Sequence, residues 1–180
     1  VSNYRLVANS LWQNDGEGIF TDVGGPSGTA GDGGLGAWGH TIGSAWGDMD
    51  NDGHMDLFVG NFSHKPDYQD RPKFLRNLGT EGGFKFQDMS GNAGLAWQES
   101  FASPALGDYD NDGDADIFVT NFGANVLYRN EGQDAGWRYR DISAETGLGE
   151  DQSWSTGSSF VDYDLDGDLD LYVANYLEYS

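Results

Sequence analysis

The sequence predicts an all-β fold made of about three four-stranded antiparallel blades of a β-propeller. Three observations lead to this prediction: an Asp-rich loop occurs three times, each copy runs into a short apolar segment, and two further signatures recur between the copies. The repeat is roughly 55–65 residues long, and four strands at this period are typical of a propeller blade. A β-sandwich with repeated turns is the alternative, but sandwiches rarely repeat their sequence.

Each repeat is expected to supply its strands in a fixed order. The innermost strand comes first, because a stretch of small residues precedes each loop and small side chains suit the crowded centre of a radial sheet. The second strand is the apolar run after each loop, which is too short for a helix and rich in β-formers. These expected strands cover residues 41–46, 103–106 and 155–160, and residues 57–59, 117–119 and 171–173.

Two more signatures predict the third and fourth strands. The third strand ends in an Asn followed shortly by a Gly, which indicates a hairpin turn. The fourth carries an aromatic residue and then an Asp two positions later, with a Gly six residues beyond that Asp. Because the Asp recurs in register as Asp22, Asp88 and Asp141, we expect a structural hydrogen-bonding role for it rather than catalysis. The third-strand signatures begin at Leu11, Leu75 and Leu127.

The composition is that of a folded domain. Hydrophobic residues make up 37% of the 180 residues and aromatic residues 14%, whereas a disordered acidic tail would lack aromatic and β-branched residues. The 28 glycines have no Gly-X-Y period, which excludes collagen and suits short strands joined by turns. Because there is no cysteine, the chain contains neither disulfides nor thiolate metal sites.

The charge of the chain excludes several classes of partner. Its formal net charge is −21, from 30 acidic and 9 basic residues. Such a field repels phosphate backbones and anionic lipids, so we expect neither nucleic-acid binding nor membrane insertion. No apolar stretch of about 18 residues is present either. The excess of carboxylates indicates that bound cations neutralise some of them.

The acidic loop follows the pattern Asp-x-Asp-x-Asp-Gly-x-x-Asp in all three copies. Calcium takes about six to eight oxygen ligands, and carboxylates at positions 1, 3 and 5 converge when the chain wraps around an ion. The Gly at position 6 permits the turn, position 7 offers its backbone carbonyl, and position 9 closes the shell. We therefore expect about three calcium ions, held by Asp48, Asp50, Asp52, His54 and Asp56, by Asp108, Asp110, Asp112, Asp114 and Asp116, and by Asp162, Asp164, Asp166, Asp168 and Asp170.

An EF-hand, a solvated turn and a magnesium site fit the loop less well than a calcium site does. An EF-hand needs a Glu at position 12 between two helices, but this position is Val59, Val119 or Val173 within an expected strand. Solvated turns are the plain alternative for one acidic run, and three copies with Gly in register disfavour it. Magnesium prefers water and few carboxylates to a cage made wholly of protein.

No catalytic constellation can be assembled, so the chain is expected not to be an enzyme. The three histidines are His40, His54 and His64, and neither a triad nor a metal-ligand spacing includes them. His54 lies at position 7 of a loop, where its side chain is expected to face solvent. The sequence Asn61-Phe62-Ser63 matches the N-glycosylation sequon, which either marks a surface loop after a strand or is a chance match.

The chain is read as a single repeat domain, residues 1–180, that contains two incomplete blades. Residues 1–40 supply strands three and four of one blade, residues 41–100 and 101–150 each form a blade, and residues 151–180 supply the first two strands of another. A closed propeller takes at least four blades. We therefore expect either head-to-tail pairing with other copies of the chain, in a ring or a filament, or completion by sequence outside it.

The acidic loops, each followed by Leu/Ile-Phe/Tyr-Val and a small residue before Asn, resemble the FG-GAP or VCBS repeats of integrin α-type β-propellers. The strand-three and strand-four signatures resemble especially the cartilage acidic protein branch of that family. This resemblance implies a calcium-stabilised, extracellular or cell-surface propeller that serves adhesion or binds a protein or glycan ligand. The alternative is a carbohydrate-binding propeller, or the non-catalytic propeller part of a polysaccharide-active enzyme.

Overall fold

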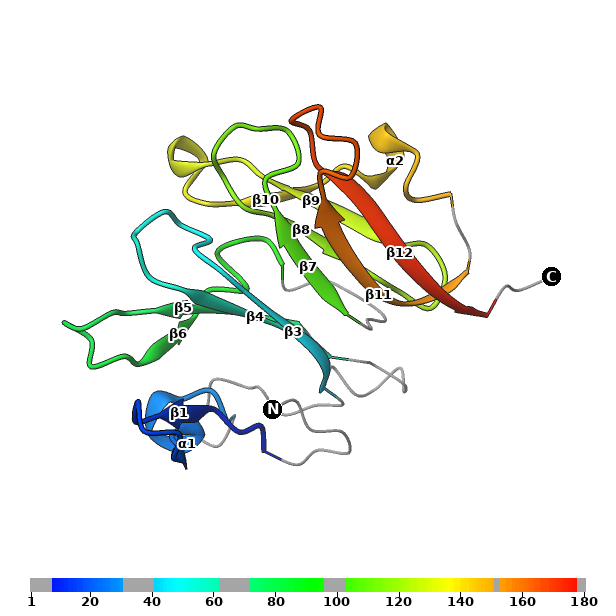
Figure 1. Ribbon diagram of the computed structural model, residues 1–180. Coiled ribbons are helices and arrows are strands. Elements are labelled where there is room, and N and C mark those ends of the chain that lie inside the picture. Colours follow the sequence, from blue (N-terminus) through cyan, green and yellow to red (C-terminus); the bar gives the residue numbers. More distant parts are fainter. Residues whose placement is uncertain (1–7, 31–40, 62–71, 96–102, 151–152, 178–180) are drawn as a thin grey trace.

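The computed structural model describes residues 8–30, 41–61, 72–95, 103–150 and 153–177, and it confirms the predicted all-β blade architecture. The described strands form four antiparallel sheets (Figure 1). Two sheets have four strands each, and the other two have two strands each. In each four-stranded sheet the strands lie in the order in which they follow along the chain. This meander is the arrangement expected of a propeller blade.

The strand bounds agree with the recurring signatures. The first complete blade contains β3 (Thr41–Gly47), β4 (Asp56–Asn61), β5 (Lys73–Asn77) and β6 (Phe86–Asp88). The second contains β7 (Pro104–Gly107), β8 (Asp116–Val119), β9 (Val126–Asn130) and β10 (Tyr139–Asp141). The two-stranded sheets are β1 (Trp12–Asn14) with β2 (Phe20–Asp22), and β11 (Trp154–Val161) with β12 (Asp170–Leu177).

Three short helical segments were not predicted. They are α1 (Gly24–Ser27), α2 (Ser143–Thr146) and the 3₁₀ turn η1 (Gln133–Ala135). Each is a single turn, which is too short to produce the helical periodicity by which a sequence reveals a helix. The two α-turns follow the fourth strands and end at Gly28 and Gly147, which have φ angles of 87° and 79°. This left-handed conformation explains why a Gly recurs six residues after the strand-four Asp.

The first strands of successive blades lie next to one another, as expected for the innermost strands of a radial array. Strand β3 contacts β7, and β7 contacts β11. A β-carbon at Gly107 would lie 2.7 Å from Cδ2 of Phe160, and one at Gly47 would lie 2.7 Å from Cδ1 of Leu106. The small residues of these strands therefore allow the blades to approach closely.

The hydrophobic core lies between the blades. Alternate residues of a strand point to opposite faces of its sheet, so both faces of a blade can be buried. In β4, Phe58 faces the second blade, while Leu57 and Val59 pack towards Leu11 beside the β1–β2 hairpin. In β8 the same alternation directs Ile117 towards the first blade, and Phe118 lies in a cluster with residues of β11 and β12.

Two side features of the sequence can be placed in this fold. Asn61 of the glycosylation sequon is 0% exposed, and its Oδ1 accepts a hydrogen bond of 2.7 Å from Thr41 Oγ1. The surface-loop interpretation of Asn61 was therefore wrong, because the strand continues through this residue. Among the described residues, no helix is long and apolar enough to cross a membrane.

Candidate metal centres

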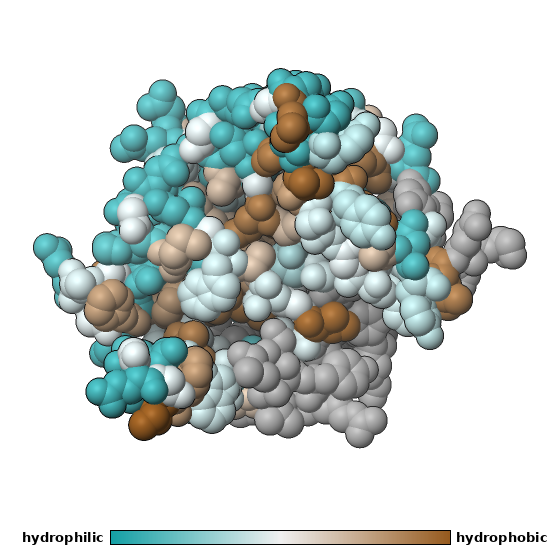
Figure 2. Space-filling view, in the orientation of Figure 1, coloured by the Kyte–Doolittle hydropathy of each residue, from teal (hydrophilic) through white to brown (hydrophobic). Residues whose placement is uncertain are grey.

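The three acidic loops gather at one edge of the molecule (Figure 1). Each joins the first and second strands of a blade, since β3 ends at Gly47 and β4 begins at Asp56, with the same arrangement in the next two sheets. Because the blades lie side by side, the loops form a row. Hydrophilic side chains dominate the surface along this edge (Figure 2).

The first Asp of each loop organises the backbone of that loop. Asp48 accepts hydrogen bonds from the backbone N–H groups of Asp52 (3.0 Å) and Gly53 (2.8 Å). Gly53 has a φ of 85°, so the turn requires the left-handed conformation that Gly adopts without strain. Asp108 and Asp162 make the equivalent pairs of bonds in the other loops, at 3.0–3.2 Å.

The last Asp connects the loop to the third strand. Asp56 is 0% exposed and accepts hydrogen bonds from the N–H groups of Met49 (2.9 Å) and Asn77 (2.8 Å). Asp116, also 0% exposed, accepts the matching bonds from Tyr109 (3.1 Å) and Asn130 (2.8 Å). This carboxylate therefore holds the loop and two strands in a fixed relation.

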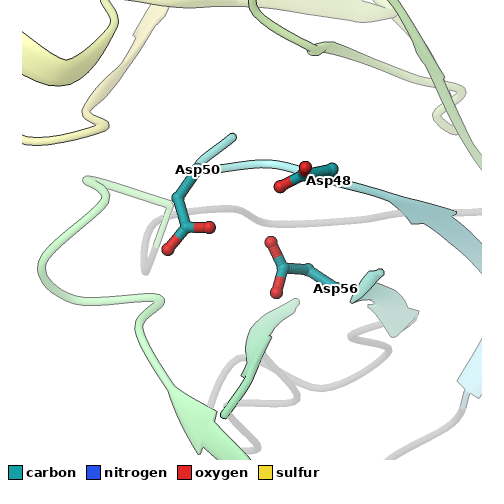
Figure 3. Close-up of side chains that lie close together, drawn as sticks. All are labelled: Asp48, Asp50 and Asp56. Atoms are coloured by element: carbon teal, nitrogen blue, oxygen red, sulfur yellow. The ribbon is translucent and has the colours of Figure 1, made fainter. Parts of the chain in front are cut away.

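The structure brings the carboxylates at positions 1, 3 and 9 of every loop together. In the first loop these are Asp48, Asp50 and Asp56, whose side chains point towards one another (Figure 3). One carboxylate oxygen from each member lies within 4.8 Å of the others. The other two triads are Asp108, Asp110 and Asp116, and Asp162, Asp164 and Asp170.

The remaining predicted ligands belong to none of the triads. The position-5 carboxylates, Asp52, Asp112 and Asp166, stand outside the triads and accept the N–H of position 7 at 2.9, 2.9 and 3.0 Å. Position 7 is His54, Asp114 or Asp168, which was expected to contribute only a backbone carbonyl. The ring of His54 lies against Gly79 and the residue is half-buried, so its side chain faces solvent only in part.

Burial of single carboxylates makes the first two triads electrostatically unfavourable without a cation. Desolvation raises the pKa of Asp56 to about 6 and that of Asp116 to about 7, although each accepts two backbone hydrogen bonds. Burial also raises the pKa of Asp50, against the lowering effect of Arg76. The Oδ1 atom of Asp50 is buried without a hydrogen-bond partner.

These features fit a hard divalent cation. The convergent atoms are all carboxylate oxygens, which calcium prefers, and a bound cation would offset the cost of placing the charges together. Such an ion would be held by the carboxylates at positions 1, 3 and 9. Its chemistry here would be structural, because it would cross-link the loop to the strands that Asp56 and Asp116 already connect.

Sequence reasoning missed the contacts that connect one loop to the next. The side-chain amide of Asn51 donates to the Gly113 carbonyl (3.2 Å) and to Asp114 Oδ1 (2.7 Å). Asn111 donates in the same way to the Gly167 carbonyl (3.2 Å) and to Asp168 Oδ1 (2.9 Å). Position 4 is Asn in both of these loops, and this recurrence could have indicated a contact between loops. The third loop has Leu165 at position 4.

The recurring strand-four Asp has the predicted structural role. Asp141 Oδ1 accepts hydrogen bonds from the N–H (2.9 Å) and hydroxyl (2.6 Å) of Ser143. That hydroxyl in turn accepts the N–H of Leu127 in the third strand (2.9 Å). Asp88 and Ser90 make the same bonds in the first blade, where the hydroxyl of Ser90 accepts the N–H of Phe74. Phe74 is therefore the equivalent of Leu127, and the predicted start of this signature at Leu75 was one residue too late. In the first hairpin, Asp22 accepts the N–H of Gly24 (2.9 Å).

The fold and the loops define a propeller-type repeat protein. The FG-GAP-like repeat family matches residues 48–119 and again residues 108–173, so its matches span more than half of the chain. The chain therefore belongs to the FG-GAP-like repeat family, as the loop pattern predicted.

Two known relatives agree with this assignment. The chain is 24% identical over 178 residues to Cartilage acidic protein 1 of Xenopus tropicalis, and 25% identical over 172 residues to Cartilage acidic protein 1 of Homo sapiens. Each alignment covers 93% of this chain. The chain spans about a quarter of the length of these relatives, with 25% and 24% of them covered.

Proposed function

We propose that the chain is a calcium-binding structural module of an extracellular propeller, in which one calcium ion per acidic loop stabilises each blade. The observation that carries the proposal is the same carboxylate triad in all three loops, each within 4.8 Å. Calcium binding and folding are coupled in this proposal, because the loop and strand geometry that assembles the triad exists only in the folded chain.

Chelation tests the structural role of calcium. Calcium at about 100 times its Kd stabilises a protein by about 2.7 kcal/mol per site, provided that it binds only the folded state. The thermal midpoint of the chain should therefore fall on addition of EDTA and return with excess calcium. An unchanged midpoint would contradict the proposal. Magnesium at the same concentration should restore less stability, since the sites offer several carboxylates in place of the water shell that magnesium retains.

A pair of matched variants tests the ligands. Asp110→Asn removes one carboxylate of the second triad, whereas Asp134→Asn removes an exposed carboxylate that belongs to none of the triads. We expect weaker calcium binding in calorimetric titration for Asp110→Asn and unchanged binding for Asp134→Asn. Equal effects of the two substitutions would show a general charge effect instead of ligation.

The proposed extracellular location requires calcium sites of matching affinity. Calcium sites of extracellular modules bind with Kd values of about 10⁻⁴–10⁻³ M, which suits the calcium concentration outside cells. The relatives' name, Cartilage acidic protein 1, is compatible with such a setting. A measured Kd in this range supports the location, and a submicromolar Kd contradicts it.

We propose further that the outer edge of β12 pairs with the β1–β2 hairpin of another copy. In the described part of the chain, β12 pairs only with β11. Asn14 ends β1 as Asn77 ends β5, and each accepts the N–H of the Gly two residues later. The backbone N–H of Asn14 would then reach Asp170 as that of Asn77 reaches Asp56.

Sedimentation of the chain in calcium tests this pairing. Dimers or larger assemblies that dissociate on Asn14→Pro, which removes the N–H, support pairing between copies. A monomer at all concentrations contradicts it. The proposal as a whole assigns the chain a binding and adhesion role with no catalytic step, in contact with a protein partner.

Glycan binding is the second candidate function. A groove of about 710 Å³ between the first and second blades is lined by Trp137, Gln133 and Asn51, among other residues. An aromatic ring beside the Gln133 side chain and several carboxylates suits a sugar ring and its hydroxyl groups, and Trp137 has a strained φ of 58°. Binding to a glycan array that Trp137→Ala abolishes and Phe84→Ala preserves would support this candidate, and absence of binding would eliminate it.

A further inference from the structure

Arg76 is a cation already placed at the first acidic loop. It lies on β5, and its guanidinium pairs through Nε with Oδ2 of Asp50 and through Nη2 with Oδ2 of Asp52, at 2.8 Å for the second pair. These carboxylates are positions 3 and 5 of the loop, and Asp50 also belongs to the triad. The side chain of Asp50 is 6% exposed and that of Arg76 is 36% exposed, so the carboxylate end of this pair is shielded from water while the arginine partly faces solvent.

The second blade has an arginine at the same place, but a neighbour holds it. Arg129 precedes Asn130 on β9 as Arg76 precedes Asn77 on β5. The Nη2 of Arg129 lies 2.9 and 3.0 Å from the two carboxylate oxygens of Glu131, and its Nε lies 3.2 Å from Oε1. Glu131 also accepts a bond of 2.8 Å from Nε of Arg140.

One residue accounts for this difference between the blades. Glu131 directly follows the strand-three Asn in the second blade, whereas Leu78 follows it in the first. Leu78 offers no acceptor, so Arg76 has the loop carboxylates as its partners. In the second blade, Arg129 forms its hydrogen bonds with Glu131. Asp110, at position 3 of the second loop, is exposed.

We propose that Arg76 is an affinity-determining residue that competes with calcium at the first loop and makes it a weaker site than the second loop. The proposal rests on the proposed calcium function. Arg76 occupies the Oδ2 atoms of Asp50 and Asp52 and places a positive charge beside the triad, so it opposes a second cation there even though Oδ1 of Asp50 has no partner. Glu131 removes the same competition from the second loop. The two sites therefore fill at different calcium concentrations although their loop patterns match.

The loop glycines allow each site to be followed separately. The N–H of Gly53 binds Asp48 and that of Gly113 binds Asp108, so each amide reports on its own triad in ¹H–¹⁵N NMR spectra. In a calcium titration of the whole chain, we expect the Gly53 signal to reach its midpoint at about tenfold higher calcium than the Gly113 signal. This ratio corresponds to about 1.4 kcal/mol.

Two substitutions form a matched pair, because Arg76→Gln and Arg129→Gln remove the same charge from equivalent places. Arg76→Gln should lower the Gly53 midpoint about tenfold, and Arg129→Gln should leave the Gly113 midpoint within about twofold. Arg76→Gln should also lower the thermal midpoint in EDTA and raise it in excess calcium. Leu78→Glu supplies the missing acceptor and should lower the Gly53 midpoint while Arg76 is retained.

Specific results overturn the inference. If Gly53 titrates with or before Gly113 in the unsubstituted chain, or if Arg76→Gln weakens the first site, then Arg76 supports the loop and does not compete with calcium. If Arg76→Gln and Arg129→Gln shift the calcium midpoints of their own loops equally, the effect comes from the change in net charge and not from competition at the first loop. If calcium moves neither glycine signal, the proposed calcium function fails together with the inference. If both signals move but Gly53 does not titrate after Gly113, only the inference fails.

Discussion

Substitution of Gly107 by Ala tests the close approach of the innermost strands. Gly107 ends β7, and a β-carbon there would lie 2.7, 2.8 and 3.0 Å from Cδ2, Cγ and Cβ of Phe160. Packed carbon atoms are optimally separated by about 3.5–4.0 Å. Since Phe160 belongs to β11 and packs in the cluster between the second blade and β12, the added methyl group must push two blades apart or change the Phe160 rotamer.

The expected magnitude combines two opposing effects. Overpacking of a well-packed core costs about 1–3 kcal/mol. Replacement of Gly by Ala where the backbone permits it stabilises by about 0.4–1 kcal/mol, through the lower entropy of the unfolded chain. The Gly107 φ lies outside the left-handed region, so this second effect applies. We expect the free energy of unfolding of Gly107→Ala to fall by about 1–2 kcal/mol.

Urea unfolding followed by tryptophan fluorescence in saturating calcium measures this change. Gly157→Ala is the matched control, because Gly157 lies on β11 and a β-carbon there would meet nothing within 4 Å. The control should be neutral or more stable by about 0.4–1 kcal/mol. Equal stability of the two variants would refute the reasoning that the blades touch at Gly107. If Gly107→Ala costs less stability in a Phe160→Ala background, which lacks Cγ and Cδ2, than in the unsubstituted chain, the strain lies at this contact.

Three further predictions concern protons and hydrogen bonds. The folded-state pKa values of about 6 for Asp56 and about 7 for Asp116 lie above the ordinary value of 3.8, so the folded state holds more protons between these limits. The urea midpoint in EDTA should therefore fall as the pH rises from 4 to 7, and a rise in the midpoint would contradict this prediction. Calcium affinity should increase over the same pH range, because calcium displaces protons from these carboxylates. Ser143→Ala leaves a buried strand N–H without its acceptor and should cost about 1–3 kcal/mol in urea unfolding, while Ser158→Ala, whose hydroxyl has no partner, should be nearly neutral. Asn111→Gly keeps the left-handed backbone (φ 58°) but removes two bonds to the third loop, so the free energy of unfolding should fall by about 1 kcal/mol, and an unchanged value would show that these bonds contribute nothing.

The repeated features of the fold were predictable because each copy supports the interpretation of the others. An apolar run such as Ile117 to Val119 could belong to a strand or a buried helix when taken alone. Its position directly after the same acidic loop in three places identifies it as the second strand, and β4, β8 and β12 each begin at the last loop Asp. The role of Asp141 was predictable for the same reason, since a hydrogen bond needed by every blade recurs in every blade.

Features that distinguish the copies could not be predicted from the repeat. Arg76 and Arg129 occupy equivalent positions, but their partners depend on whether Leu78 or Glu131 follows the strand. The sequence pattern treats position 5 of the loop like positions 1 and 3, whereas Asp52 is directed to the N–H of His54 and to Arg76. Such choices among nearby donors depend on three-dimensional packing, which one-dimensional spacing does not contain.

The bonds from Asn51 and Asn111 give the row of loops a direction. Each reaches forward to the next loop, so the position-6 carbonyl and the position-7 carboxylate of a loop are held by the Asn of the loop that precedes it in this row. Leu165 stands where the third Asn would be and is 86% exposed, so its side chain cannot extend the series. Because most residues of the third loop are exposed and its position-4 side chain can donate no hydrogen bond, native-state hydrogen exchange should record faster opening of this loop than of the other two.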